Sequence, residues 1–190
     1  MADNELSLNR ANQAFENGHL AEAARIARRV VAEEPHNAAA RALLGEALVE
    51  NGDLREGISF LKEALAIEPE SIDIRFALGD ACFEVGDSSR AEEMYRSIID
   101  RDPEQVDALV SLGLLHFHED RLDQAEHCYR LALEADPDSL FALQSLGDVC
   151  FAAGRYDEAR ACFLKAMDLD PQDPQNHYNL AEFLHEQGEL

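Results

Sequence analysis

The chain has 190 residues, including 39 Asp or Glu and 16 Lys or Arg, and its formal net charge at pH 7 is −23. This negative charge repels phosphate backbones and anionic lipid headgroups, so nucleic acid and membrane surfaces are excluded as expected partners. Hydrophobic residues make up 46% of the sequence, enough to form a buried core. The N-terminus lacks a basic segment followed by an apolar one, and no apolar run approaches about 20 residues, so we expect a soluble, cytoplasmic protein.

Five of the six prolines recur at intervals of 34 residues, from Pro35 to Pro171. A period of this length predicts stacked supersecondary units, each of which contacts its neighbours, rather than one globular core. We therefore expect a single array over residues 1–190. Its predicted units are a degenerate first repeat at 4–37, four further repeats at 38–71, 72–105, 106–139 and 140–173, and a capping or truncated half repeat at 174–190.

Within each unit the apolar residues follow helical spacing. In the fifth unit, Leu143, Leu146 and Cys150 fall on one face of the first half, and Ala159 and Phe163 fall on one face of the second half. Each unit is therefore predicted to be a helical hairpin, and the fold class to be all-α.

Glycines and polar residues recur at fixed positions in these hairpins, where position 1 is the first residue of each repeat. Glycines at position 15 are expected to end the first helices in the left-handed conformation, and glycines at position 8 are expected to let the two helices of a hairpin approach closely. Asp120 replaces one position-15 glycine, which predicts a turn that is a little strained or differently shaped. The predicted N-caps of the first helices are Asn37, Ser71, Ser139 and Asp173, with Gln105 as a weak cap.

Leu112-Gly113, Ala125, Tyr129 and Pro137 stand at the spacing of a known repeat signature. With these residues the chain resembles the tetratricopeptide repeat family, although no unit has the tryptophan of that family. The resemblance implies an α-solenoid in which helix-turn-helix hairpins form a right-handed superhelix and the first helices line a concave groove. The same signature recurs at Leu78-Gly79, Ala91, Tyr95 and Pro103, and at Leu146-Gly147, Ala159, Phe163 and Pro171.

Mapping the groove positions of the family onto this chain gives acidic residues beside a ladder of apolar residues. We interpret this surface as a site for a protein or peptide partner, an extended or helical segment with basic and apolar side chains. The other reading is that the apolar ladder belongs partly to the core and that the acids only solvate a helix face. The predicted groove residues are Glu46, Glu50, Phe76, Asp80, Phe83, Glu84, Val110, Leu114, Phe117, His118, Gln144, Asp148 and Phe151.

Two further hypotheses concern other classes of function. The first of these hypotheses is that the chain is the recognition or regulatory region of a longer enzyme, such as a glycosyltransferase. It is alternatively a self-association module, in which the last half repeat exposes Leu180, Phe183 and Leu184 and docks on another copy in a homo-oligomer.

Histidine and cysteine residues are the remaining candidates for ligands or nucleophiles. His116 takes a buried position of its repeat, His118 and His127 are expected in solvent, and the four cysteines follow the repeat as core residues. No HExxH, GxSxG, GxxxxGK or GxGxxG motif is present. We therefore expect no metal, no cofactor and no catalytic residues.

Overall fold

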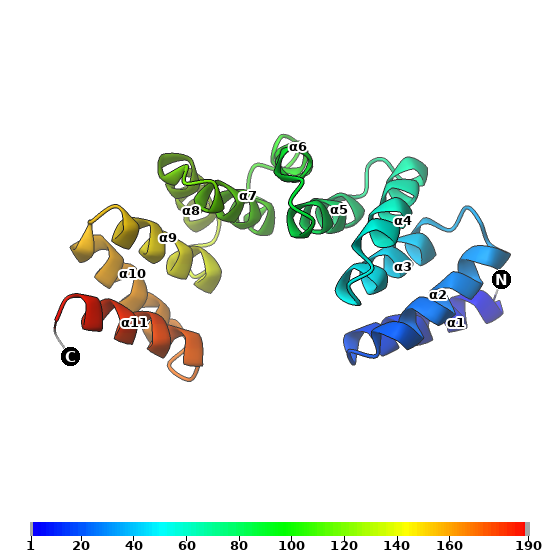
Figure 1. The fold of residues 1–190 in the computed structure, drawn as a ribbon, viewed down its shortest axis with the longest axis horizontal. Helices are drawn as coiled ribbons and strands as arrows, with labels where there is room; N and C mark the ends of the chain where they lie inside the picture. The colour runs from blue at the N-terminus through cyan, green and yellow to red at the C-terminus, as the bar shows by residue number, and fades with distance from the viewer. Residues whose placement is uncertain (1, 189–190) are drawn as a thin grey trace. The chain divides into compact units, whose positions relative to one another are not determined.

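The computed structural model describes residues 2–188, which form eleven α-helices joined by short turns (Figure 1). The first helices of the successive hairpins α3 to α11 begin 34 residues apart, which confirms the all-α hairpin repeat. The first helices are α1 (Ala2–Glu16), α3 (Ala38–Glu50), α5 (Ile72–Glu84), α7 (Val106–His118), α9 (Leu140–Ala152) and α11 (Pro174–Glu186). The second helices are α2 (Leu20–Glu33), α4 (Leu54–Ile67), α6 (Ser88–Ile99), α8 (Leu122–Ala135) and α10 (Tyr156–Leu169).

The chain divides into two compact units, Met1–Met94 and Tyr95–Leu190, and the boundary falls within α6. In the first unit, α1 contacts α3 and α3 contacts α5, while α2 and α4 each pack against the first helix that follows them. In the second unit, α7, α9 and α11 contact one another in the same sequential way. Each unit therefore has its own layer of adjacent first helices.

The first helices begin at the predicted caps. The side chains of Asn37, Ser71, Ser139 and Asp173 each accept a hydrogen bond from a backbone N–H two or three residues further on. Gln105 makes no such bond, as expected for a weak cap. These bonds satisfy N–H groups that have no partner inside the helix.

The turns after the first helices contain the predicted left-handed residues. Gly18, Gly52, Gly86 and Gly154 all have positive φ angles, and Asp120 adopts the same conformation with φ of 59°. The φ angle of Asp120 therefore matches those of the glycines, and its Cβ atom crowds the backbone in this region.

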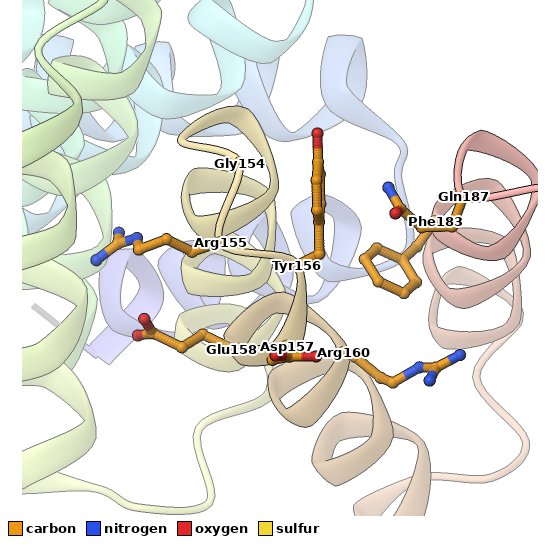
Figure 2. Close-up of a pocket in the computed structure, with 8 residues that line it drawn as sticks. All are labelled: Gly154, Arg155, Tyr156, Asp157, Glu158, Arg160, Phe183 and Gln187. Atoms are coloured by element: carbon orange, nitrogen blue, oxygen red, sulfur yellow. The ribbon is translucent and has the colours of Figure 1, made fainter.

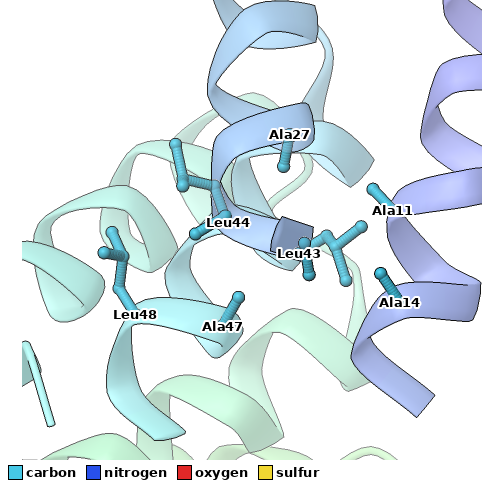
Figure 3. Close-up of a cluster of buried hydrophobic side chains, with 9 residues drawn as sticks. Ala11, Ala14, Ala27, Leu43, Leu44, Ala47 and Leu48 are labelled. Carbon is cyan, nitrogen blue, oxygen red and sulfur yellow. The ribbon is translucent and has the colours of Figure 1, made fainter. Parts of the chain in front are cut away.

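The core of the first unit is built mainly from small side chains. Figure 3 shows Ala11, Ala14 and Ala47 beside Leu43 and Leu44, where α1 and α3 meet. Further along α3, Leu48 completes this buried cluster. Because alanine is short, the helices pack with little side chain between them.

The core of the second unit contains aromatic rings. Phe163 and Phe183 lie with their ring centroids 5.9 Å apart, and Tyr129 is buried in the same cluster. At the α9–α10 contact, an added Cβ on Gly147 would lie 2.5 Å from the Phe163 ring. The position-8 glycine therefore makes room for an aromatic side chain of the second helix.

Candidate functional site

The predicted groove residues of the first unit lie on two adjacent first helices, α3 and α5, and we call this surface the α3–α5 face. Glu50, Asp80 and Glu84 are exposed on it. Glu46, Phe76 and Phe83 also belong to it and are half-buried. The face therefore combines carboxylates in contact with water and phenyl rings that are partly covered.

The carboxyl group of Glu46 is strongly perturbed by its surroundings. Its pKa is raised to about 7, first because neighbouring atoms remove it from water and second because Glu50 and Asp73 repel its negative charge. Within residues 2–188, Glu46 and Glu50 form no ion pair. The ionised form of Glu46 is thus left without a compensating cation.

In the second unit the predicted residues lie on α7 and α9. Leu114, His118 and Asp148 are exposed. The other four predicted residues, Val110, Phe117, Gln144 and Phe151, are half-buried.

Several of the half-buried residues already have partners within the protein. The Phe151 ring lies 5.8 Å from both the Phe183 ring and the Tyr156 ring, measured between centroids. Phe117 also packs against the core cluster of this unit. Gln144 donates from Nε2 to Oδ1 of Asn176 at 2.7 Å and therefore links α9 to α11. These contacts leave less of each side chain for a partner.

Two exposed aromatic residues on the first helices were not among the predicted groove residues. Phe141 on α9 is 75% exposed and Tyr178 on α11 is 60% exposed. Tyr178 stands at the repeat position of the predicted residues Phe76 and Gln144, so the repeat already placed it on this face. Phe141 precedes Asp148 by seven residues, so helical spacing was the signal that could have identified it.

Asp148 has a carboxylate neighbour on the next first helix. Its pKa is raised to about 6 because surrounding atoms desolvate it and because Glu182 of α11 repels its charge. Asp148 is nevertheless more exposed than Glu46, so solvent screens its charge better. Of these two carboxyl groups, Glu46 is the more strongly perturbed.

The histidine and cysteine residues lie where the repeat predicts. His116 is buried, while His118 and His127 are exposed. Cys82, Cys128 and Cys150 are buried, and Cys162 is half-buried. Burial raises the pKa of the Cys162 thiol to about 11, which disfavours the reactive thiolate.

A pocket of about 500 Å³ lies beside the turn between α9 and α10 (Figure 2). The Arg160 guanidinium carbon lies 5.9 Å from the centroid of the Phe183 ring at its border. Similar hollows occur at the equivalent turns of the first and second repeats, at 18–22 and at 52–56. Because they recur with the repeat, these hollows belong to its architecture and do not mark one chemical site. The pocket in Figure 2 is lined by Gly154, Arg155, Tyr156, Asp157, Glu158, Arg160, Phe183 and Gln187.

The expectation that the last half repeat exposes Phe183 is wrong. Phe183 is only 3% exposed, and Leu180 and Leu184 are half-buried against the same core. The repeat explains the burial of Phe183, because its counterparts at position 10 of the four preceding repeats are buried as well. These counterparts are Ala47, Ala81, Leu115 and Val149.

None of the helices described between residues 2 and 188 combines the length and the apolar character needed to cross a membrane.

Comparison with known proteins identifies the family. The family described as tetratricopeptide repeat matches residues 14–61, 48–111 and 83–150, and a second family described as TPR repeat matches residues 147–188. A comparison with curated proteins found no match.

Solved structures share the fold at low sequence identity. The crystal structure of MamA is 24% identical, with a TM-score of 0.74, over 85% of this chain and 95% of that one. A thermophilic TPR protein of Thermus thermophilus is 20% identical, with a TM-score of 0.80, over 96% and 99% of the two chains. YrrB, described as a TPR protein with an unusual peptide-binding site, is 20% identical, with a TM-score of 0.70, over 96% and 90%. Since the family matches extend over most of the sequence, the chain belongs to the tetratricopeptide repeat family.

Proposed function

We propose that this protein is a non-catalytic interaction module whose first-helix faces bind a protein segment with basic and apolar side chains. Tetratricopeptide repeats are typically protein-interaction modules, and the similar structure of YrrB is described as having a peptide-binding site. Membership of this family supports a protein as the partner, and the acidic first-helix faces of this chain support basic side chains in that partner.

The observation that carries this proposal is the state of Glu46. Its carboxyl is half-buried, and its acidic neighbours Glu50 and Asp73 make its ionisation unfavourable. A Lys or Arg side chain of a partner would relieve this repulsion and form charge-assisted hydrogen bonds. Charge complementarity of this kind also accelerates association and helps to exclude acidic partners.

The distribution of ion pairs also supports the first-helix faces as the binding surface. Arg25, Arg28 and Arg29 of α2 pair with acids on α2 and α4. Glu50 and Asp148 of the first-helix faces form no ion pair within the described residues 2–188. These arginines thus neutralise acids on the second helices, and the two carboxylates remain available to a partner.

The test is a peptide-binding experiment with charge reversal. Fluorescein-labelled peptides that contain Arg and Leu, Arg and Ser, or Glu and Leu are titrated with the full chain at several salt concentrations. We expect the Arg-Leu peptide to bind most tightly and its affinity to fall as salt rises. Asp80→Lys combined with Glu84→Lys should weaken this binding at least tenfold and flatten its salt dependence.

The matched control reverses two exposed acids on second helices, Glu134→Lys in α8 and Asp168→Lys in α10, and so changes the net charge equally. If both double variants weaken binding to the same extent, only the overall charge attracts the peptide and the first-helix faces are not the site. If the wild-type chain binds none of the peptides, the proposed function is wrong.

A further inference from the structure

Neighbouring first helices of the second unit each carry one exposed aromatic ring and one exposed carboxylate. Phe141 and Asp148 are on α9, Tyr178 and Glu182 are on α11, and we call these four residues the α9–α11 patch. Phe141 is 75% exposed and Tyr178 is 60% exposed, more than either Leu114 or Tyr156 of the same unit. Exposed rings of this size beside polar groups are typical of interaction surfaces.

We propose that the α9–α11 patch binds a partner segment in which one apolar side chain packs on Phe141 and Tyr178 while a Lys or Arg lies against Asp148 and Glu182. This inference rests on the proposed function and goes further, because it names Phe141 and Tyr178 as the residues that hold the apolar side chain of the partner. The half-buried rings of Phe117 and Phe151 are engaged in the core and have a smaller part in binding.

Helical spacing and the charge interaction between Asp148 and Glu182 bring the four residues to one surface. Phe141 and Asp148 are seven residues apart and Tyr178 and Glu182 are four apart, spacings that keep each pair on one side of its helix. At a rise of 1.5 Å per residue, Phe141 and Asp148 are separated by about 10 Å along α9. An extended segment covers that distance in about three residues, so the anchor and the cation should be three residues apart in the partner.

A partly buried hydrogen-bond network fixes α9 against α11. Gln144 donates to Oδ1 of Asn176 at 2.7 Å and to Oδ2 of Asp173 at 3.3 Å. Asn176 in turn donates to the backbone oxygens of Ala166 and Asp170 at 3.0 and 2.9 Å. Gln144 lies between Phe141 and Asp148 on α9, and Asn176 lies two residues before Tyr178. The network therefore holds α9 and α11, the helices that carry the two rings, against each other, which reduces the entropy that these helices lose on binding.

The charges around the patch select a cationic partner. Neither α9 nor α11 contains a Lys or Arg residue. Desolvation and the Glu182 charge raise the pKa of Asp148, so a partner cation would favour the ionised form of its carboxyl. A second copy of this chain, which carries the same net charge of −23, complements the patch poorly.

The experiment uses the full chain and three fluorescein-labelled peptides: one with Leu and Arg three residues apart, one with Ser in place of Leu, and one with Glu in place of Arg. Fluorescence anisotropy measures the affinity of each. Phe141→Ala with Tyr178→Ala should weaken the binding of the Leu-Arg peptide at least tenfold, which is about 1.4 kcal/mol. The same variant should leave the affinity for the Ser-Arg peptide unchanged. Asp148→Asn with Glu182→Gln should weaken the binding of both peptides that contain Arg.

The matched control is Leu164→Ala, which truncates a side chain that is 45% exposed on the second helix α10 and should change no affinity more than twofold. Circular dichroism checks that each variant keeps its helix content. If the wild-type chain binds the Leu-Arg peptide and the aromatic double variant binds it equally well, this inference is wrong while the proposed function stands. If no peptide binds the wild-type chain, both are wrong. If sedimentation shows a dimer that the aromatic double variant loses, a second copy occupies the patch and the cationic partner is excluded.

Discussion

The first unit packs its hairpins with alanine and leucine, whereas the second unit fills the equivalent spaces with aromatic rings. In the first unit Gly45 faces Leu61, and in the second Gly147 faces Phe163. The helices nevertheless keep the same 34-residue spacing in both units. The repeat therefore sets where a side chain lies, while the choice of residue at each position remains free to vary.

The same contrast holds on the first-helix faces. Glu46 in the first unit is half-buried near Glu50 and Asp73, while Asp148 in the second is exposed and lies near Glu182. Both acids occupy position 9 of their repeats. The first unit thus offers a more strongly desolvated carboxyl, and the second offers a more accessible one on a helix that also carries the exposed ring of Phe141.

Truncation of the core should give the largest difference between the units. Phe163→Ala removes a ring that is 3% exposed and packs on Gly147 and Phe183, so we expect a loss of about 3–5 kcal/mol in the free energy of unfolding. Leu61→Ala removes a smaller buried side chain and should cost about 2–3 kcal/mol. Urea unfolding followed by circular dichroism measures both, with the exposed Leu164→Ala as control. An equal or larger loss for Leu61→Ala would contradict the view that the aromatic core is the more sensitive one.

The second prediction compares the two perturbed acids through pH. Since the folded-state pKa of Glu46 is raised to about 7, the folded state holds this proton when the unfolded state has already lost it. Ionisation of Glu46 therefore lowers stability as pH rises from the ordinary carboxyl range through 7, and the loss is complete above that. Glu46→Gln removes the charge, so the variant should be more stable than the wild type by about 2 kcal/mol at pH 8 and by only about 0.5 kcal/mol at pH 5.

Asp148→Asn is the matched comparison. The folded-state pKa of Asp148 is raised to about 6, so its ionisation also lowers stability as pH rises, over a window that ends near 6. Solvent screens this exposed group, so the gain at pH 8 should remain below about 1 kcal/mol. Urea unfolding at pH 5 and 8 gives the difference for each variant. A larger effect at Asp148 would reverse our ranking of the two carboxyl groups.

Much of this structure could be predicted from the sequence, because the repeat relates each position to several others. The caps at Asn37 and Ser71 and the left-handed turn at Asp120 all lie where the 34-residue period places them. Position in the repeat also predicted the burial of His116. Local backbone geometry and the helical period were sufficient for these features.

The degree of exposure within the candidate site could not be predicted in the same way. Phe141 and Phe151 are both phenylalanines on α9, yet Phe141 is 75% exposed and Phe151 packs on Phe183. Their difference depends on which side chains of α10 and α11 cover each position, and this is a tertiary property. Likewise, the hydrogen bond between Gln144 and Asn176 joins two helices and cannot be predicted from the residue pattern of either helix alone.

The third prediction concerns the buried amide that distinguishes the last first helix. Asn176 is 1% exposed, whereas the counterparts at position 3 in the first unit, Ala40 and Ile74, are apolar. Asn176→Ala leaves the backbone oxygens of Ala166 and Asp170 without their amide donor, so we expect a loss of about 1–3 kcal/mol. Hydrogen exchange should show faster exchange in α11, and the exposed Gln175→Ala serves as control. Unchanged protection of α11 would show that the apolar contacts alone hold this helix.

The smallest effect is expected at the turn after α7. The corresponding turns after α1, α3, α5 and α9 use Gly18, Gly52, Gly86 and Gly154, while the turn after α7 has Asp120 with φ of 59°. Asp120→Gly removes the strain of the Cβ atom but gives the unfolded chain more freedom, so the net stabilisation should be about 0.5–1 kcal/mol. Asp136→Gly is the control, because Asp136 has φ of −133° and accepts a hydrogen bond from the Asp138 N–H at 3.1 Å. This change should lower the stability of the folded protein. Thermal unfolding measures both, and a lower melting temperature for Asp120→Gly would mean that the Asp120 side chain stabilises its turn more than its backbone strains it.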